Sequence, residues 1–356
     1  MYPEDKLLRP DSNILFVLMG SIGDVARALP LASELKRYSP QIKITWVVEP
    51  KSADLVKLST AVDRVVVFER GKGITALVRA IKQIREGRYD LVLDLQRHFK
   101  SGLFALLSRG KVRIGFNRRN SKEFNWLFQN KSIPFREETD SKLLHYLEFT
   151  KLLGISTSFP PEFSLRKPAL SHSLNAKLNF SEKPAVGLIL NSSWTSKDWL
   201  PEGYQKLIKM IAAQGDTRIM LLGDHTKQSL SQKLVQNIPQ EIIVNLVGQT
   251  TLAELISVLA NLNAVVGPDT GPGHIAAAFG VPYVTLVGPT DPGRITPLGM
   301  EEFVVKASVP CSPCMRKRCP GLGTVCMKLI SPELVFVKLK MALSQALSSP
   351  KSATIR

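Results

Sequence analysis

Three polar loops, each following an apolar run, contain the residue types that could do chemistry. The first is Gly20-Ser21-Ile22-Gly23-Asp24, which follows the run Asn13–Met19. Its two glycines allow a tight turn and the close approach of a ligand. Asp24 heads an amphipathic segment, where an aspartate either caps a helix or faces a ligand as a general base. The spacing differs from the G-x-G-x-x-G fingerprint, so a dinucleotide site is not supported.

The second loop, Asn191–Pro201, follows the apolar run Ala185–Leu190 and contains Thr195 and Lys197. Hydroxyl groups and a lysine at the end of a strand suit a phosphate, because lysine supplies a point charge and the hydroxyls supply hydrogen-bond donors. The alternative is a surface loop with a solvated lysine.

The third loop, Asp269-Thr270-Gly271-Pro272-Gly273-His274, leads into the small-residue segment Ile275–Phe279. The first-turn N–H groups of such a helix present partial positive charge to an anion. His274 is either a structural histidine or, beside Asp269, part of the site. A further loop, Gly288–Pro292, follows the next apolar run and belongs to the same rim.

The elements that position these loops follow from the apolar runs. Runs without polar alternation suit parallel strands that are buried on both faces. They recur at Ile42–Val48, Val65–Phe68, Leu91–Leu95, Arg218–Leu222, Ile242–Asn245, Ala264–Val266 and Tyr283–Val287. A stretch rich in Pro and Ser between Gly154 and Lys183 predicts a linker. We therefore expect two doubly wound α/β domains, 1–170 and 184–331, with a last helix at about 332–347 that packs back on the first.

The charge of the chain favours an anionic partner. With 47 basic and 30 acidic residues, the net charge is +17. The stretch Arg97–Lys131 holds nine basic residues and one acid, Glu123. No helix-turn-helix, zinc-finger, RRM or KH pattern is present, so we do not expect nucleic acid as the partner. No apolar run reaches the ~18–20 residues that span a bilayer, and no secretory signal is evident, so we expect a cytoplasmic protein.

All four cysteines, Cys311, Cys314, Cys319 and Cys326, lie in one short stretch. In a reducing cytoplasm such a cluster favours metal ligation over disulfides. A small structural zinc or iron knuckle is one interpretation, although the spacing is not that of a standard finger. Free thiols are the other.

Several segments resemble the family 9 glycosyltransferases, the ADP-heptose:lipopolysaccharide heptosyltransferases. They are GSIGDVARALP, TSKDWLP and VGPDTGPGHIAAAFGVPYVTLVGPTDP, while LVLDLQRHFKSGLFALLSRGKVRIGF is similar to the D-L-Q and R-I-G-F region of that family. The resemblance covers nearly the whole chain. It implies an α/β GT-B fold: two Rossmann-like doubly wound domains facing an interdomain cleft, with the acceptor on the N-terminal domain and the nucleotide sugar on the C-terminal one.

The resemblance also implies roles for the loop residues. Asp24 becomes the general base that deprotonates the acceptor hydroxyl, and a single displacement inverts the anomeric carbon of ADP-heptose. The ADP leaving group is stabilised by Lys197, Thr195 and the N–H groups around Thr270 and Gly271, while Asp269 holds heptose hydroxyls and His274 supports its loop. A lysine and a helix dipole replace a divalent cation, so the chemistry requires no metal or other cofactor. Pro272-Gly273 stands where the family commonly has Leu-Ser, which changes the loop.

For the basic stretch, the resemblance suggests an anionic glycolipid acceptor. The cations expected to meet carboxylates and phosphates of the lipopolysaccharide inner core are Arg97, Lys100, Arg113, Arg118, Arg119 and Lys122. The interleaved aromatic residues then rest at the lipid interface, in reversible contact with the inner face of the bacterial inner membrane. The alternative is a solvated basic face with its aromatic residues packed inward.

Two other functions fit the same features. One is a GT-B transferase that uses another nucleotide sugar, because a few side chains set donor specificity. The other is a non-catalytic nucleotide- or nucleic-acid-binding α/β module. The variant Asp24→Ala separates them, since only an enzyme loses turnover while it still binds ADP.

Overall fold

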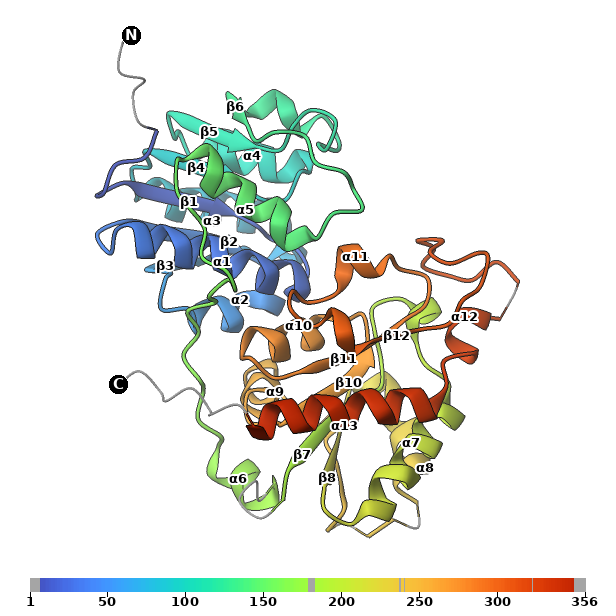
Figure 1. The fold of residues 1–356 in the computed structure, drawn as a ribbon. Helices are drawn as coiled ribbons and strands as arrows, with labels where there is room; N and C mark the ends of the chain where they lie inside the picture. Colours follow the sequence, from blue (N-terminus) through green and yellow to red (C-terminus); the bar gives the residue numbers. More distant parts are fainter. Residues whose placement is uncertain (1–6, 179–182, 237, 240, 322, 349–356) are drawn as a thin grey trace. The chain divides into compact units, whose positions relative to one another are not determined.

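The computed structural model describes residues 7–178, 183–236, 238–239, 241–321 and 323–348. The chain divides into two compact units, Met1–Arg166 and Lys167–Arg356, and each contains one six-stranded parallel sheet (Figure 1). None of the helices in these described ranges has the length and apolarity of a membrane span.

The sheet of the first unit has the strand order β3-β2-β1-β4-β5-β6, and every neighbouring pair is parallel. Its strands are β1 (Asn13–Val17), β2 (Lys43–Val48), β3 (Arg64–Val67), β4 (Leu91–Asp94), β5 (Val112–Gly115) and β6 (Lys131–Ser132). The helices are α1 (Ile22–Tyr38), α2 (Pro50–Lys57), α3 (Gly73–Arg85), α4 (Phe99–Leu107) and α5 (Lys142–Leu152), with 3-10 turns η1 (Arg70–Lys72) and η2 (Asn125–Phe128). The central strand β1 is buried on both faces, as its unbroken apolar run predicts.

The second unit repeats this topology, with the strand order β12-β11-β10-β7-β8-β9 and parallel pairing throughout. Its strands are β7 (Ala185–Ile189), β8 (Arg218–Leu222), β9 (Ile243–Asn245), β10 (Ala264–Pro268), β11 (Tyr283–Val287) and β12 (Val304–Lys306). The longer helices are α7 (Pro201–Gln214), α8 (Gln228–Val235), α9 (Leu252–Leu259), α10 (Gly271–Ala278) and α13 (Pro332–Ser348). Shorter elements are α6 (His172–Leu178), α11 (Pro292–Ile295), α12 (Val325–Lys328), η3 (Thr195–Lys197), η4 (His225–Lys227) and η5 (Glu301–Phe303).

Both sheets have the doubly wound order in which the first strand lies beside the fourth. The connections leave this point in opposite directions, and the resulting crevice at the carboxyl ends of the strands is where such folds bind ligands. In the first unit the loops after β1 and β4 meet there, and in the second unit the loops after β7 and β10. The three polar loops predicted from the sequence therefore all lie at such switch points, and the expected Rossmann-like organisation is confirmed.

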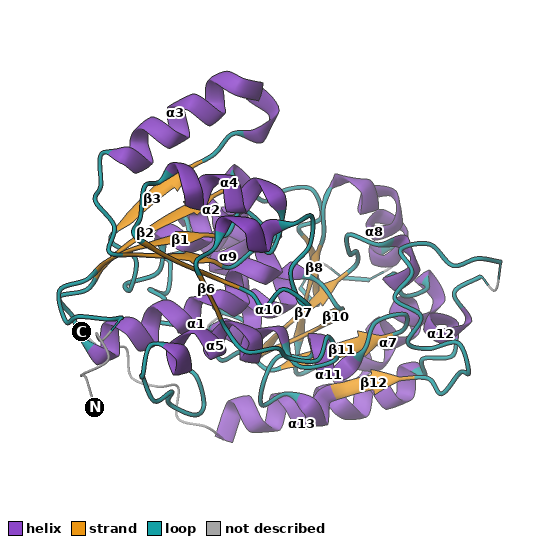
Figure 2. Cartoon of the chain, turned by 90° about the horizontal axis from the view of Figure 1, so that it is seen from above, coloured by secondary structure: helices purple, strands orange, loops and turns teal. Residues whose placement is uncertain are grey.

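The boundary between the two units, at Arg166/Lys167, falls within the Pro- and Ser-rich stretch that was predicted as a linker. The same stretch contains α6, whose Leu178 is fully buried. The last helix, α13, belongs to the second unit. It lies along the sheet of the second unit and contacts α7, β10 and β11, with Val335 and Leu339 in that unit's core (Figure 2). An apolar stripe shows that a helix covers a sheet, but it does not show which of two similar sheets is covered.

Candidate functional site

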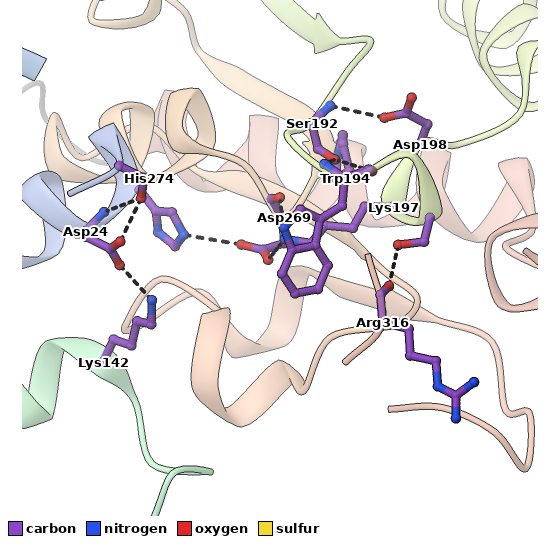
Figure 3. Close-up of polar contacts among 12 residues, drawn as sticks. Asp24, Lys142, Ser192, Trp194, Lys197, Asp198, Asp269, His274 and Arg316 are labelled. Carbon is purple, nitrogen blue, oxygen red and sulfur yellow. Dashed lines mark hydrogen bonds and ion pairs between the residues drawn. The ribbon is translucent and has the colours of Figure 1, made fainter. Parts of the chain in front are cut away.

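Asp24 lies in the first turn of α1, at the switch point of the first sheet. Ser21 is the N-cap of this helix, and its hydroxyl accepts a hydrogen bond from the Asp24 N–H at 3.3 Å. The interpretation of Asp24 as the N-cap is therefore wrong, because Ser21 occupies that position and Asp24 lies three residues later, in the first turn. It accepts hydrogen bonds from Ser21 Oγ at 2.8 Å, Lys142 Nζ at 2.7 Å and Arg27 Nη2 at 3.0 Å (Figure 3).

The charges around Asp24 determine its protonation state. Burial by itself raises the pKa of this carboxyl group, but the nearby charges of Lys142 and Arg27 and the hydrogen bonds of Lys142 and Ser21 outweigh burial. They hold the pKa of Asp24 well below its usual range, so the group is an ionised hydrogen-bond acceptor at physiological pH. Lys142, at the start of α5, was not predicted as a site residue, because 118 positions separate it from Asp24.

A second carboxylate, Asp94, is fully buried at the end of β4. Its oxygens accept hydrogen bonds from the Gln96 N–H at 3.0 Å, Ser101 Oγ at 3.0 Å and Asn125 Nδ2 at 2.6 Å, and also from Gln129 Nε2 at 2.9 Å. Burial nevertheless raises the pKa of Asp94.

This network reaches the loop that carries Asp24. Gln96 Oε1 accepts a hydrogen bond from the Met19 N–H at 2.7 Å, immediately before Gly20. The sequence Asp94-Leu95-Gln96 therefore fixes the carboxyl ends of two neighbouring strands, β4 and β1. The sequence marked this tripeptide only through the family resemblance and gave it no role.

In the second unit, Lys197, Asp269 and His274 form a buried row (Figure 3). Lys197 Nζ lies 2.6 Å from Asp269 Oδ2 and 4.1 Å from the centre of the Trp194 ring. The other carboxylate oxygen of Asp269 lies 3.5 Å from His274 Nε2. The structure thus brings together three residues from two of the predicted loops. Lys197 is ion-paired rather than solvated, so the surface-loop alternative for this lysine is wrong.

The row lies beside the start of α10. Thr270 is the N-cap of this helix, and its side chain makes no capping hydrogen bond. Thr270 and Gly271 therefore begin a helix end whose N–H groups suit an anion. Thr195 opens η3 and is exposed, two residues before Lys197.

Gly273 leaves room for the ring of Tyr283. A Cβ atom at this position meets the Tyr283 ring at 2.1 Å, so α10 can approach β11 this closely only with glycine. The Tyr283 hydroxyl donates a hydrogen bond to the Pro268 carbonyl at the start of the Asp269 loop. Burial raises the pKa of Tyr283 well above its usual value. This neutral tyrosine supports the loop, and the sequence did not single it out.

The cysteine-rich loop packs against two other loops of the second unit. Ser196 Oγ donates to the Arg316 carbonyl at 2.7 Å, and the Met315 N–H donates to the Pro289 carbonyl at 2.8 Å. All four cysteines, Cys311, Cys314, Cys319 and Cys326, are free. The expected zinc or iron knuckle is not supported, because among the residues that the structure describes no three Cys, His, Asp or Glu side chains are grouped to hold a metal ion.

The cations expected to bind an acceptor differ in their environments. Arg97 pairs with Glu138 at 2.6 Å, and the Arg113 side chain donates to the Phe128 and Gly110 carbonyls, so both hold the fold of their own unit. Three others lie over aromatic rings: Lys100 over Phe68, Arg118 over Trp126 and Arg119 over Phe135. Lys122 is exposed.

The aromatic residues of the basic stretch also divide. Phe116 is buried and packs against Phe149, whereas the side chain of Phe124 is largely exposed. Neither the lipid-facing nor the inward-packed interpretation holds for the whole stretch.

Comparison with known proteins adds to this geometry. The family model "Glycosyltransferase family 9 (heptosyltransferase)" matches residues 77–324. The chain is 26% identical over 301 residues to the lipopolysaccharide core heptosyltransferase OpsX of Haemophilus influenzae, covering 82% of this chain and 84% of that one. It is 28% identical over 321 residues to lipopolysaccharide heptosyltransferase 1 of Pseudomonas aeruginosa, covering 86% and 87%.

The solved structures agree on the fold. E. coli heptosyltransferase WaaC with ADP matches with a TM-score of 0.76 at 24% identity, covering 93% of this chain and 99% of that one. The same enzyme with ADP-2-deoxy-2-fluoro heptose matches with a TM-score of 0.73 at 23% identity, covering 92% and 99%. The GT-B fold expected from the sequence is confirmed. With two doubly wound sheets and a family match over most of its length, the chain belongs to glycosyltransferase family 9, the heptosyltransferases.

Proposed function

We propose that this protein transfers heptose from ADP-heptose to the inner core of lipopolysaccharide, with inversion and without a metal ion, as a cytoplasmic protein in reversible contact with the inner membrane. The family match and the names of the relatives support heptosyl transfer to lipopolysaccharide. The observation that carries the proposal for this chain is the buried lysine Lys197, placed at a sheet switch point beside the start of α10.

On the donor side, we assign ADP-heptose to the predicted C-terminal domain, residues 184–331, which lies within the second unit. Lys197 exchanges Asp269 for a diphosphate oxygen, and Thr195 and the N–H groups of Thr270 and Gly271 bind the remaining phosphate oxygens. Asp269, released from the lysine, accepts hydrogen bonds from heptose hydroxyls while His274 holds its other oxygen. Lysine and the helix N-terminus stabilise the charge that develops on ADP, which is the work of a divalent cation in other transferases.

On the acceptor side, we assign the glycolipid to the first unit, Met1–Arg166. Asp24 accepts the proton of the attacking acceptor hydroxyl. The acceptor oxygen forms its bond to the anomeric carbon from the face opposite to ADP, and the bond between that carbon and the phosphate oxygen breaks with its electron pair leaving on ADP. The result is inversion in one displacement.

The low pKa of Asp24 fits a late proton transfer. A carboxylate held ionised by Lys142 and Arg27 is a weak base toward an ordinary alcohol. It becomes competent once the oxygen has begun to bond to the anomeric carbon, because the hydroxyl proton is then strongly acidic. Lys142 and Arg27 keep the carboxylate charged and oriented until that point.

The acceptor itself is identified by its charge. The cations Lys100, Lys122, Arg118 and Arg119 lie on or near the surface of the first unit and suit phosphates and carboxylates of an inner core. Arg97 and Arg113, which are engaged within the unit, position the surrounding loops in this proposal.

The test is product analysis by mass spectrometry. The protein is incubated with ADP-heptose and a truncated core acceptor, with ADP-glucose and a uridine-diphosphate sugar as parallel donors. The proposal expects a gain of one heptosyl unit with ADP-heptose alone, and the gain persists in the presence of a chelator. A gain with another donor, or none with ADP-heptose, contradicts the assigned substrate.

A further inference from the structure

Helix α3 exposes apolar side chains that do not belong to its buried inner face. Its inner face, with Ala80, Ile81 and Ile84, is buried in the core of the first unit. Ile74 and Val78, four residues apart and therefore on one face, are 70% and 61% exposed. In Figure 2, α3 lies outermost over the β3 side of the first sheet.

Cations accompany this apolar face. Helix α3 itself carries three cations and no acid, while Glu69, which precedes it, pairs with Lys72 and Arg79. Arg79, Lys82 and Arg85 are exposed and follow Val78 around the helix. Long cationic side chains on each side of a short aliphatic stripe are typical of a helix that lies at a lipid surface, because the stems cover apolar surface while the charges reach the headgroups.

A second exposed apolar group lies on α4, on η2 and on Phe124, the residue that precedes η2. Phe124 and Leu127 are 69% and 61% exposed, and Phe99 packs edge-on against Phe128 with much of its ring exposed. Glu123 and Phe124 have φ angles of 51° and 56°, in the left-handed region that residues other than glycine occupy only at a cost. The chain thus holds a large aromatic ring in solvent in a strained backbone conformation.

The start of α4 connects the two groups. The Phe99 N–H donates a hydrogen bond to Glu123 Oε2 at 3.2 Å, so α4 lies beside the residues that precede η2. Lys100, next to Phe99, lies over the ring of Phe68, two residues before Arg70. η1, the start of α3 and the start of α4 therefore belong to one continuous surface. We call it the basic–apolar face, defined by Arg70, Ile74, Val78, Phe99, Phe124 and Leu127.

We propose that the basic–apolar face docks this protein on an anionic lipid bilayer. This inference rests on the proposed function, because it assigns a surface to the membrane contact proposed there. Charge complementarity favours this occupant: a second copy of a chain with net charge +17 meets the same cations, whereas anionic headgroups neutralise them. Ile74, Val78 and Leu127 are aliphatic and insert among acyl chains.

The experiment measures co-sedimentation of the full chain with vesicles of phosphatidylethanolamine and phosphatidylglycerol, and with phosphatidylcholine vesicles. We expect wild-type protein to bind the anionic vesicles and to be released by salt. The double variant Ile74→Ser/Val78→Ser lowers the partition coefficient about tenfold, because both side chains lose their transfer from water to acyl chains. Lys82→Glu lowers it about fivefold, because a surface cation is replaced by an anion.

The matched control is Leu329→Ser, which removes a leucine of similar exposure (60%) from the second unit. Equal binding of the double variant and wild type, equal loss in the control, or equal binding to neutral vesicles overturns the proposal. Failure of the proposed function is separately visible, because these vesicles contain no acceptor. With a soluble, delipidated acceptor, the double variant is expected to retain wild-type kcat/KM.

Discussion

Removal of the ion pair between Lys142 and Asp24 is expected to shift the pH dependence of the reaction, and the size of this shift can be worked out in pH units. Replacing Lys142 by Met removes a charge whose Nζ lies 2.7 Å from Asp24 Oδ1, with both side chains mostly buried. A cation this close lowers the pKa of a carboxyl group by about 1 to 3 pH units, or roughly 1.4 kcal/mol for each. The variant keeps the Arg27 contact at 3.0 Å, so it loses only part of the stabilisation of the carboxylate.

The sign follows from the direction of the native shift. Because the pKa of Asp24 lies below its usual range, the wild-type carboxylate stays charged until the pH falls through that depressed value. In Lys142→Met the pKa rises, so Asp24 becomes protonated at a higher pH. The acid limb of kcat/KM therefore moves by about 1 to 3 pH units toward neutral pH.

The assay is kcat/KM for heptosyl transfer, measured from about pH 2 to 8 at those pH values where circular dichroism shows that the protein is folded. A single protonation produces a limiting slope in this profile. Lys142→Arg keeps the charge and is expected to restore the wild-type profile. Lys151→Met removes another lysine of α5, paired with Glu148 at 2.7 Å, and is expected to leave the profile unchanged. Superimposable profiles for Lys142→Met and wild type refute the reasoning, because the ion pair then has no influence on the group that limits the reaction.

Three further substitutions test the supports of the two sites. Lys197→Met is expected to weaken ADP binding about 10- to 100-fold in calorimetry, because a charged hydrogen bond is lost. Lys227→Met, which removes the partner of Asp198, is expected to leave the affinity for ADP unchanged. Gly273→Ala is expected to lower the free energy of unfolding by about 1–3 kcal/mol in urea melts, because the added methyl group overlaps Tyr283. This loss of stability is expected to be smaller in a Tyr283→Ala background. An equal loss there contradicts the overlap. Asp94→Asn turns an amide N–H₂ group toward side chains that themselves donate hydrogen bonds. It is expected to lower the free energy of unfolding by about 1–3 kcal/mol and to lower the transfer activity as well. Asp54→Asn on the surface is expected to leave both quantities unchanged.

Much of the fold could be predicted because parallel strands buried on both faces leave unbroken apolar runs in the sequence. The carboxyl ends of these runs at Met19, Leu190 and Val266 then located the site loops. One local signal was available and unused: Ser21-Ile22-Gly23-Asp24 has the Ser-x-x-acid spacing of a capping box, which makes Ser21 the N-cap.

What the sequence could not provide is the pairing of charges across the fold. Asp24 meets Lys142 118 positions away, and Lys197 meets Asp269 72 positions away. From the sequence, Lys197 was expected to bind a phosphate and Asp269 a sugar. The sequence did not indicate that these two side chains form an ion pair with each other. The side of α13 was undetermined for a related reason, because its apolar stripe is equally compatible with either sheet.

The central claim is that the Asp24 carboxylate accepts the proton of the acceptor hydroxyl. Asp24→Asn keeps the size of the side chain and removes its ability to take a proton, so single-turnover transfer from ADP-heptose measures the claim directly. For Asp24→Asn we expect a single-turnover rate that is lower by about 10²- to 10⁴-fold than the wild-type rate, with the affinity for ADP unchanged. Transfer at the wild-type rate by a folded Asp24→Asn protein contradicts it.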